Sequence, residues 1–150
     1  MPVIDTSVGV VGVPLDVIWA TLIDFETYPS YMSEVVSVEY IRRSDETADS
    51  AWCVLLNGSE LRWTERDVFT PKRRITFVQL DGDIETWEGY WQVDQLSDVI
   101  HVTLHVEFDI GIPSLAGVLN PIGARAIKSN CRQMLAALQT RAIAEVSSTR

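Results

Sequence analysis

The middle of this sequence alternates between apolar and polar residues, and this repeat of two constrains the fold more than any other feature. Such alternation predicts β-strands that bury one face and expose the other. Turn-forming residues such as Asn57-Gly58 and Asp81-Gly82-Asp83 connect neighbouring segments. Strands joined so closely are antiparallel neighbours, because parallel pairs need long crossovers. The six predicted strands cover residues 35–43, 51–56, 60–69, 74–81, 86–94 and 99–110.

Other patterns flank these strands. Residues 4–13 are rich in valine and contain two glycines, which predicts a first strand with a bend. Residues 15–23 have the apolar spacing of an amphipathic helix, and residues 28–32 predict a turn that opens a second, very short helix. After Pro113 the helical period returns and Asn120-Pro121 interrupts it, so a long helix is predicted from about residue 122 to 144.

This order of elements predicts an α+β fold in which a curved antiparallel sheet of six or seven strands wraps around the long C-terminal helix. The two short helices follow the first strand. Only the long helix is able to cover the apolar face of such a sheet, and a cavity is expected between the two. We expect one domain over residues 1–150, with a frayed tail from about residue 146.

Composition and charge exclude several classes of protein. Apolar residues make up 47% and charged residues 22%, which excludes disorder. Twelve basic and twenty-one acidic residues leave a net charge of −9, so neither nucleic acid nor an anionic membrane surface is an expected partner. No signal peptide and no apolar stretch of ~18 residues is visible, which predicts a cytoplasmic protein without membrane insertion. A homodimer is compatible with this composition, and Cys53 and Cys131 are expected to be buried thiols.

Alternation along residues 60–69 places two carboxylates on the buried face. Leu61 and Trp63 should point inward, so Glu65 and Asp67 share their face, whereas Arg66 takes the other. Two acids behind a tryptophan are unexpected there, because an unpaired buried charge is costly. A bulge after Trp63 would instead place both carboxylates in solvent.

The other strands and the long helix complete a predicted pocket that is apolar with a few polar groups, as in small-molecule sites. The side chains predicted to face it are Phe77, Gln79, Trp87, Trp91 and Leu104 from the strands and Asn130 and Met134 from the helix. His101 and His105 fall on the opposite face. They lie ~13 Å apart along the strand, too far to share an ion, so no metal site is predicted.

The sequence resembles the polyketide cyclase/dehydratase branch of the START-like helix-grip superfamily over nearly its whole length. The resemblance rests on residues 13–19, residues 24–29, Trp63, Gly89-Tyr90-Trp91, Glu107-Phe108-Asp109 and Asn130. Members include aromatase/cyclases that fold poly-β-ketone chains, coenzyme Q-binding proteins and carriers of lipids or hormones. In the aromatase/cyclases, the strand of the Trp63-like residue ends in an inward arginine. Asp67 occupies that position here, and the arginine is missing unless a bulge turns Arg66 inward.

The resemblance and the pocket together predict a cyclase, aromatase or dehydratase of secondary metabolism that acts on a polyketide-like intermediate without a cofactor. Glu65 and Asp67 are the candidate acid and base, because an apolar pocket raises the pKa of a carboxyl group towards neutrality. Tyr28 or Tyr31 would donate a hydrogen bond to an enolate oxygen. The predicted substrate-binding residues are Tyr31, Met32, Trp63, Phe77, Gln79, Trp87, Trp91, Leu104, Asn130 and Met134.

Two other functions remain open from the sequence alone. The first is non-catalytic binding or transport of a quinone, a lipid or a sterol-like molecule, which needs the same pocket and no proton transfer. The second is an interaction domain with a filled core. Motifs for a serine nucleophile elbow, an HExxH zinc site, a phosphate loop or a CxxC pair do not occur, and no redox cofactor is implied.

Overall fold

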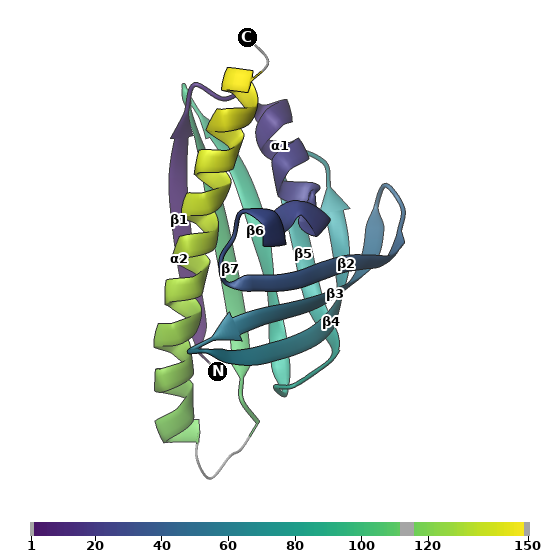
Figure 1. Ribbon diagram of the computed structural model, residues 1–150, viewed down its shortest axis with the longest axis vertical. Helices are drawn as coiled ribbons and strands as arrows, with labels where there is room; N and C mark the ends of the chain where they lie inside the picture. The colour runs from purple at the N-terminus through teal and green to yellow at the C-terminus, as the bar shows by residue number, and fades with distance from the viewer. Residues whose placement is uncertain (1, 112–115, 149–150) are drawn as a thin grey trace.

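The computed structural model describes residues 2–111 and 116–148 of the 150-residue chain. One antiparallel sheet carries all seven strands in the order β1-β7-β6-β5-β4-β3-β2, and two helices and a short 3-10 helix complete the fold (Figure 1). The elements are β1 (Val3–Val11), α1 (Leu15–Ile23), the 3-10 helix η1 (Phe25–Ser30), β2 (Val35–Arg43), β3 (Thr47–Leu56), β4 (Ser59–Thr70), β5 (Arg74–Gly82), β6 (Thr86–Leu96), β7 (Val99–Asp109) and α2 (Ala116–Ser148).

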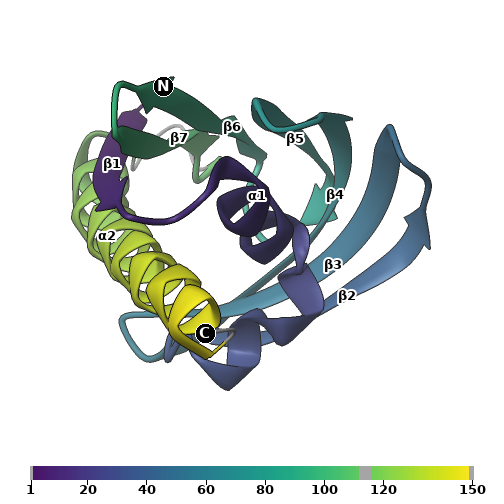
Figure 2. The ribbon, with the colours of Figure 1, turned by 90° about the horizontal axis from the view of Figure 1, so that it is seen from above.

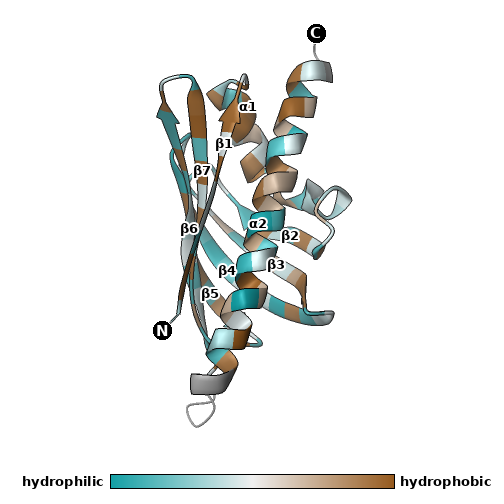
Figure 3. Ribbon diagram, turned by 90° about the vertical axis from the view of Figure 1, so that its left-hand side faces the viewer, coloured by the Kyte–Doolittle hydropathy of each residue, from teal (hydrophilic) through white to brown (hydrophobic). Residues whose placement is uncertain are grey.

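The sheet is strongly curved, and α2 spans the gap between its two edges (Figure 2). The helix packs mainly along β1 and β7 and touches β3 on the other side. The helix α1 lies within the curve of the sheet towards one end. This arrangement confirms the predicted α+β helix-grip class. Figure 3 shows hydrophobic and hydrophilic residues mixed along α2, as expected for a helix with one buried side.

Two predicted helix boundaries were wrong. Asn120-Pro121 does not interrupt α2, which runs from Ala116 to Ser148 rather than over about 122–144. Pro121 lies in the second turn of α2 with its side chain exposed, so the helix continues through it at the cost of one backbone hydrogen bond. The Asn120 side chain also accepts a hydrogen bond from the Ile110 N–H (3.3 Å), which ties the helix start to the end of β7. The second short helix is η1, over Phe25–Ser30, and not a turn of helix opening at residues 28–32.

Local chemistry explains why the strands pair in this order. Asn57 and Gly58 have φ angles of 51° and 79°, which a two-residue turn between right-twisted strands requires. The strand β3 begins at Thr47 rather than at residue 51, because Ala48 and Ser50 continue its buried alternation. Among the described residues, no helix is long and apolar enough to cross a bilayer.

The packing of α2 against the sheet should contribute strongly to stability. Leu138 is 1% exposed, so Leu138→Ala leaves a cavity and should lower the free energy of unfolding by about 2–5 kcal/mol. On the same helix Ile143 is 44% exposed, and Ile143→Ala should change that free energy by no more than about 0.5 kcal/mol. Urea denaturation of the three proteins measures both values. Equal losses in the two variants would contradict this packing of α2.

Candidate functional site

A cavity lies between α2 and the concave face of the sheet. Its free volume is about 50 Å³, whereas sites for drug-sized ligands usually have ~300–1,000 Å³. A ligand of that size therefore enters only if lining side chains move. The lining consists of Glu34, Trp52, Val54, Leu56, Leu61, Trp63, Glu65, Phe77, Trp87, Trp91, Leu104, Val106, Ile127, Asn130, Cys131 and Met134.

Eight of the residues proposed from the sequence line this one cavity. They are Trp63, Glu65, Phe77, Trp87, Trp91, Leu104, Asn130 and Met134. The tryptophans form a continuous wall, because the Trp63 ring stacks on Trp52 (5.7 Å between centroids, 4° between planes) and meets Trp87 at 4.9 Å. On α2, the Asn130 side-chain amide donates a hydrogen bond to the Leu55 carbonyl (2.7 Å), which holds the end of β3 against the helix.

The strand β4 keeps its alternation through both carboxylates. Its register with β3 is unbroken, and the irregularity against β5 falls between the pairs Thr64↔Asp81 and Glu65↔Gln79, so the extra residue, Leu80, belongs to β5. Glu65 is therefore 2% exposed and Asp67 is fully buried. The predicted inward direction of both acids follows from this register. Arg66 points outward and its guanidinium contacts Asp49 (2.9 Å), so no arginine from β4 reaches the cavity.

Two neutral donors bind the two carboxyl groups directly, and a third donor binds one of these two. The indole N–H of Trp63 donates to Glu65 Oε1 (2.7 Å), and Ser50 Oγ donates to Asp67 Oδ2 (2.7 Å). The indole N–H of Trp52 donates in turn to Ser50 Oγ (2.9 Å). The side chain of Glu65 lies at the cavity wall, and Asp67 lies directly behind it. Within the described part of the chain, no lysine, arginine or histidine lines the cavity.

Burial shifts the pKa values of both acids. Loss of water raises the pKa of Glu65 well above its usual range, and the hydrogen bond and the charge of Asp67 raise it further. Burial also raises the pKa of Asp67, although the hydrogen bonds from Glu65 and Ser50 oppose this shift. Two adjacent carboxyl groups without a cation ionise one at a time. Glu65 is therefore the member of the pair that holds its proton more strongly.

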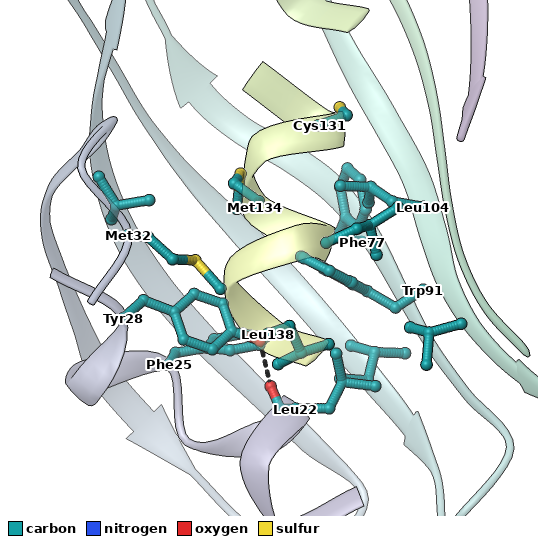
Figure 4. Close-up of a cluster of buried hydrophobic side chains, with 14 of the residues drawn as sticks. Leu22, Phe25, Tyr28, Met32, Phe77, Trp91, Leu104, Cys131, Met134 and Leu138 are labelled. Atoms are coloured by element: carbon teal, nitrogen blue, oxygen red, sulfur yellow. Dashed lines mark hydrogen bonds between the residues drawn. The ribbon is translucent and has the colours of Figure 1, made fainter. Parts of the chain in front are cut away.

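Tyr28 does not present its hydroxyl to the cavity, so its assignment as a catalytic donor was wrong. The hydroxyl donates a hydrogen bond to the Leu22 carbonyl at the end of α1, and the residue is fully buried in the core cluster of Figure 4. Burial raises the pKa of this phenol well above its usual value. The aromatic ring packs 6.1 Å from Trp91, behind the cavity wall.

The hydroxyl of Tyr28 is expected to serve stability rather than catalysis. Tyr28→Phe leaves the Leu22 carbonyl without this partner and should lower the free energy of unfolding by about 1–3 kcal/mol. Tyr40→Phe is a matched control, because its hydroxyl donates to the Ile23 carbonyl (2.6 Å) at a half-buried site and should cost less. Urea denaturation checks the order. A loss of ligand binding in Tyr28→Phe without a loss of stability would contradict it.

Three other residues proposed to bind substrate lie outside the lining. Tyr31 lies in a surface groove between α1 and α2, beneath the Arg141 guanidinium at 5.3 Å. Met32 is buried in the core cluster next to Tyr28 (Figure 4). The Gln79 amide donates to the Ile84 carbonyl (2.9 Å), so this side chain ties down the segment that follows β5.

Sequence reasoning missed two members of the hydrogen-bonded chain, Ser50 and Trp52. The predicted strand began at residue 51, which left Ser50 outside it. Extending the alternation of Trp52 and Val54 backwards by one step would have placed Ser50 on the buried face. On the convex face, His105 contacts Asp5 (2.5 Å) and stacks on Tyr90. Among the described residues, no group of three or more His, Cys, Asp or Glu side chains is arranged to hold a metal ion.

Comparison with known proteins places this architecture in a family. A family model described as polyketide cyclase / dehydrase and lipid transport matches residues 11–135. The chain belongs to this family. The match confirms the resemblance inferred from the sequence. A search of curated proteins found no match to this chain.

Solved structures share the fold of this family member at low sequence identity. A protein from Thermus thermophilus has a TM-score of 0.87 at 23% identity, and the match covers 96% of this chain and 99% of the other. The Zhui aromatase/cyclase from Streptomyces sp. R1128 has a TM-score of 0.80 at 20% identity, over 97% and 95% of the two chains. A STAR-related lipid transfer protein from Xanthomonas axonopodis has a TM-score of 0.72 at 13% identity, over 92% and 84%. At identities this low, the likeness shows that the folds are the same, and it does not extend to the activities.

Proposed function

We propose that this protein is a cofactor-free enzyme that moves a proton at a carbon next to a carbonyl group, and so cyclises, aromatises or dehydrates a polyketide-like substrate. The observation that supports it best is Glu65, a carboxyl group at the wall of an apolar cavity whose pKa is raised by burial beside the buried Asp67. Buried, paired carboxyl groups with displaced pKa values cluster at functional sites. An aromatase/cyclase among the structural neighbours agrees with this proposal by analogy.

The pair would act as acid and base in turn. When the shared proton moves to Asp67, Glu65 becomes the base and removes a proton from the carbon next to the carbonyl, which forms an enolate. The enolate carbon attacks a second carbonyl of the same chain, and the protonated Glu65 returns its proton to the new alkoxide. In a dehydration, the proton goes instead to the departing hydroxyl, which leaves as water. The protonation state of the pair is restored in either case.

The apolar wall would hold one conformation of a flexible chain. Trp63, Trp87 and Trp91 offer broad aromatic surfaces near Glu65. Placing two carbonyl-bearing carbons of one chain in contact removes much of the entropic barrier to ring closure. We propose that the eight lining residues predicted from the sequence bind the substrate, whereas Tyr31, Met32 and Gln79 support the surrounding structure.

Proton abstraction is testable without knowledge of the natural substrate. The probe is 2-acetylnaphthalene, an uncharged aromatic ketone, in D₂O at neutral pD. The protein should accelerate exchange of the methyl protons above the rate in buffer, as followed by proton NMR. Binding of the ketone without acceleration would contradict the enzymatic proposal and favour a carrier.

The second candidate function is transport of a hydrophobic ligand. It is favoured by the lining, in which Glu34, Glu65 and Asn130 are the polar side chains, and the Asn130 amide is already bonded to Leu55. The family description includes lipid transport, and one structural neighbour is a lipid transfer protein. A carrier would bind the ketone probe and leave its protons unexchanged.

A further inference from the structure

The cavity is bordered by carboxyl groups, and no cation among its described lining residues pairs with them. Glu34 and Glu65 line it, and Asp67 lies behind Glu65. The neighbouring arginines belong to the outer surface. Arg66 pairs with Asp49, and the exposed Arg43 lies over the rings of Tyr40 and the buried Phe69 at 4.6 and 5.4 Å; neither arginine lines the cavity.

The three hydrogen-bond donors around the pair are all neutral. Trp63 donates to Glu65, Ser50 donates to Asp67, and Trp52 donates to Ser50. Neutral donors stabilise one negative charge on the pair but leave its field in the cavity. An anionic ligand brought into the same low-dielectric space would be repelled with little screening, and it would also lose its own hydration.

We infer that the cavity selects its ligand by charge: it accepts a molecule that is uncharged where it meets Glu65, such as a ketone, ester or amide, and rejects a free carboxylate. This inference rests on the proposed function only in placing the ligand in this cavity. It separates the protein from carriers of free acids, which need a basic group or bulk water at the carboxylate. The charge of Asp67 is the element that enforces the selection.

The test compares two probes of nearly the same shape and different charge. Binding of 2-acetylnaphthalene and of 2-naphthoate is measured by equilibrium dialysis at about pH 7.5. Sodium chloride at about 0.3 M screens the exposed acidic residues but not the buried pair. The carboxylate should bind about tenfold more weakly or worse, which is the effect expected for two unit charges ~10 Å apart at an effective dielectric constant of ~20.

Two variants of the pair separate repulsion from the general cost of burying a carboxylate. Glu65→Gln keeps the charge on Asp67 and should keep the full difference between the probes. The double variant Glu65→Gln/Asp67→Asn has two uncharged side chains of similar volume in place of the pair. The ratio of its affinities for the ketone and the carboxylate should therefore be about tenfold smaller than in the wild-type protein. If the double variant does not fold, Asp67→Asn alone replaces it and should also narrow the difference.

Each outcome decides between distinct claims. Equal affinity of the wild-type protein for both probes would overturn charge selection and leave the cavity as the ligand site. An unchanged difference in the double variant would overturn the role of Asp67, because dehydration of the ligand or the carboxylate of Glu34 would then explain it. Failure of both probes to bind would instead contradict the location of the ligand site on which the proposed function depends.

Discussion

Replacing Glu65 with Gln is expected to slow proton exchange of a bound ketone about a hundred- to ten-thousand-fold. Removal of a positioned acid or base typically costs this much, and Gln keeps the shape of the side chain while removing its ionisable proton. The Trp63 indole still finds an acceptor in the Gln carbonyl, so the wall of the cavity should be preserved. Affinity for 2-acetylnaphthalene should therefore change by no more than about threefold. NMR exchange and equilibrium dialysis measure the two quantities on the same samples.

Glu60→Gln is the matched control, because Glu60 lies on the same strand with an exposed side chain that pairs with Arg62. It loses a carboxyl group without touching the cavity and should exchange protons at the wild-type rate. Wild-type exchange in Glu65→Gln would show that Glu65 is no catalyst. The cavity would then act by shape alone or as a carrier.

The uncharged double variant Glu65→Gln/Asp67→Asn should gain stability over the wild-type protein as the pH rises. In the folded wild type the pKa of Glu65 is raised above its usual value of 4.5, so the folded state holds a proton that the unfolded state releases. Wild-type stability therefore falls as the pH rises from about 4.5 to the folded-state pKa. Asp67 acts in the same direction, because its pKa is also raised. The fall amounts to about 1.4 kcal/mol for each unit by which a pKa is raised.

Urea denaturation of both proteins at a series of pH values measures this effect. The other acidic residues titrate alike in the two proteins and cancel in the difference between their free energies of unfolding. As the pH rises above about 4.5, the free energy of unfolding of the double variant should increase relative to that of the wild-type protein. A constant difference from about pH 4 to pH 8 would mean that the two carboxyl groups have ordinary pKa values. The pair would then have no special proton to transfer.

Local pattern predicted most of the fold for a clear physical reason. A repeat of two residues and tight turns such as Asn57-Gly58 leave few ways to pair strands, and only α2 is long enough to cover the sheet. The ends of elements were less predictable. Pro121 is an expected helix breaker, yet α2 runs through it at the cost of one backbone hydrogen bond.

The candidate site was predictable where it depends on the alternation of side chains between the two faces of a strand. Glu65 and Asp67 share a face with Trp63, and because the extra residue in this register belongs to β5, that alternation holds. Hydrogen-bond partners were not predictable. Tyr28 was expected to donate to a ligand, but its hydroxyl finds the Leu22 carbonyl, six residues earlier in the chain, through the path of η1. Cavity size also depends on side-chain packing, which periodicity does not describe.

The most direct test of the central claim is a titration of the side-chain carboxyl carbons by carbon-13 NMR, with Glu65→Gln and Asp67→Asn assigning the two signals. We expect that the Glu65 carboxyl loses its proton well above pH 4.5 and at a higher pH than the Asp67 carboxyl, and that addition of 2-acetylnaphthalene shifts its signal. A Glu65 signal that titrates near pH 4.5 and does not respond to the ketone would contradict the proposal that this buried pair holds the reacting proton.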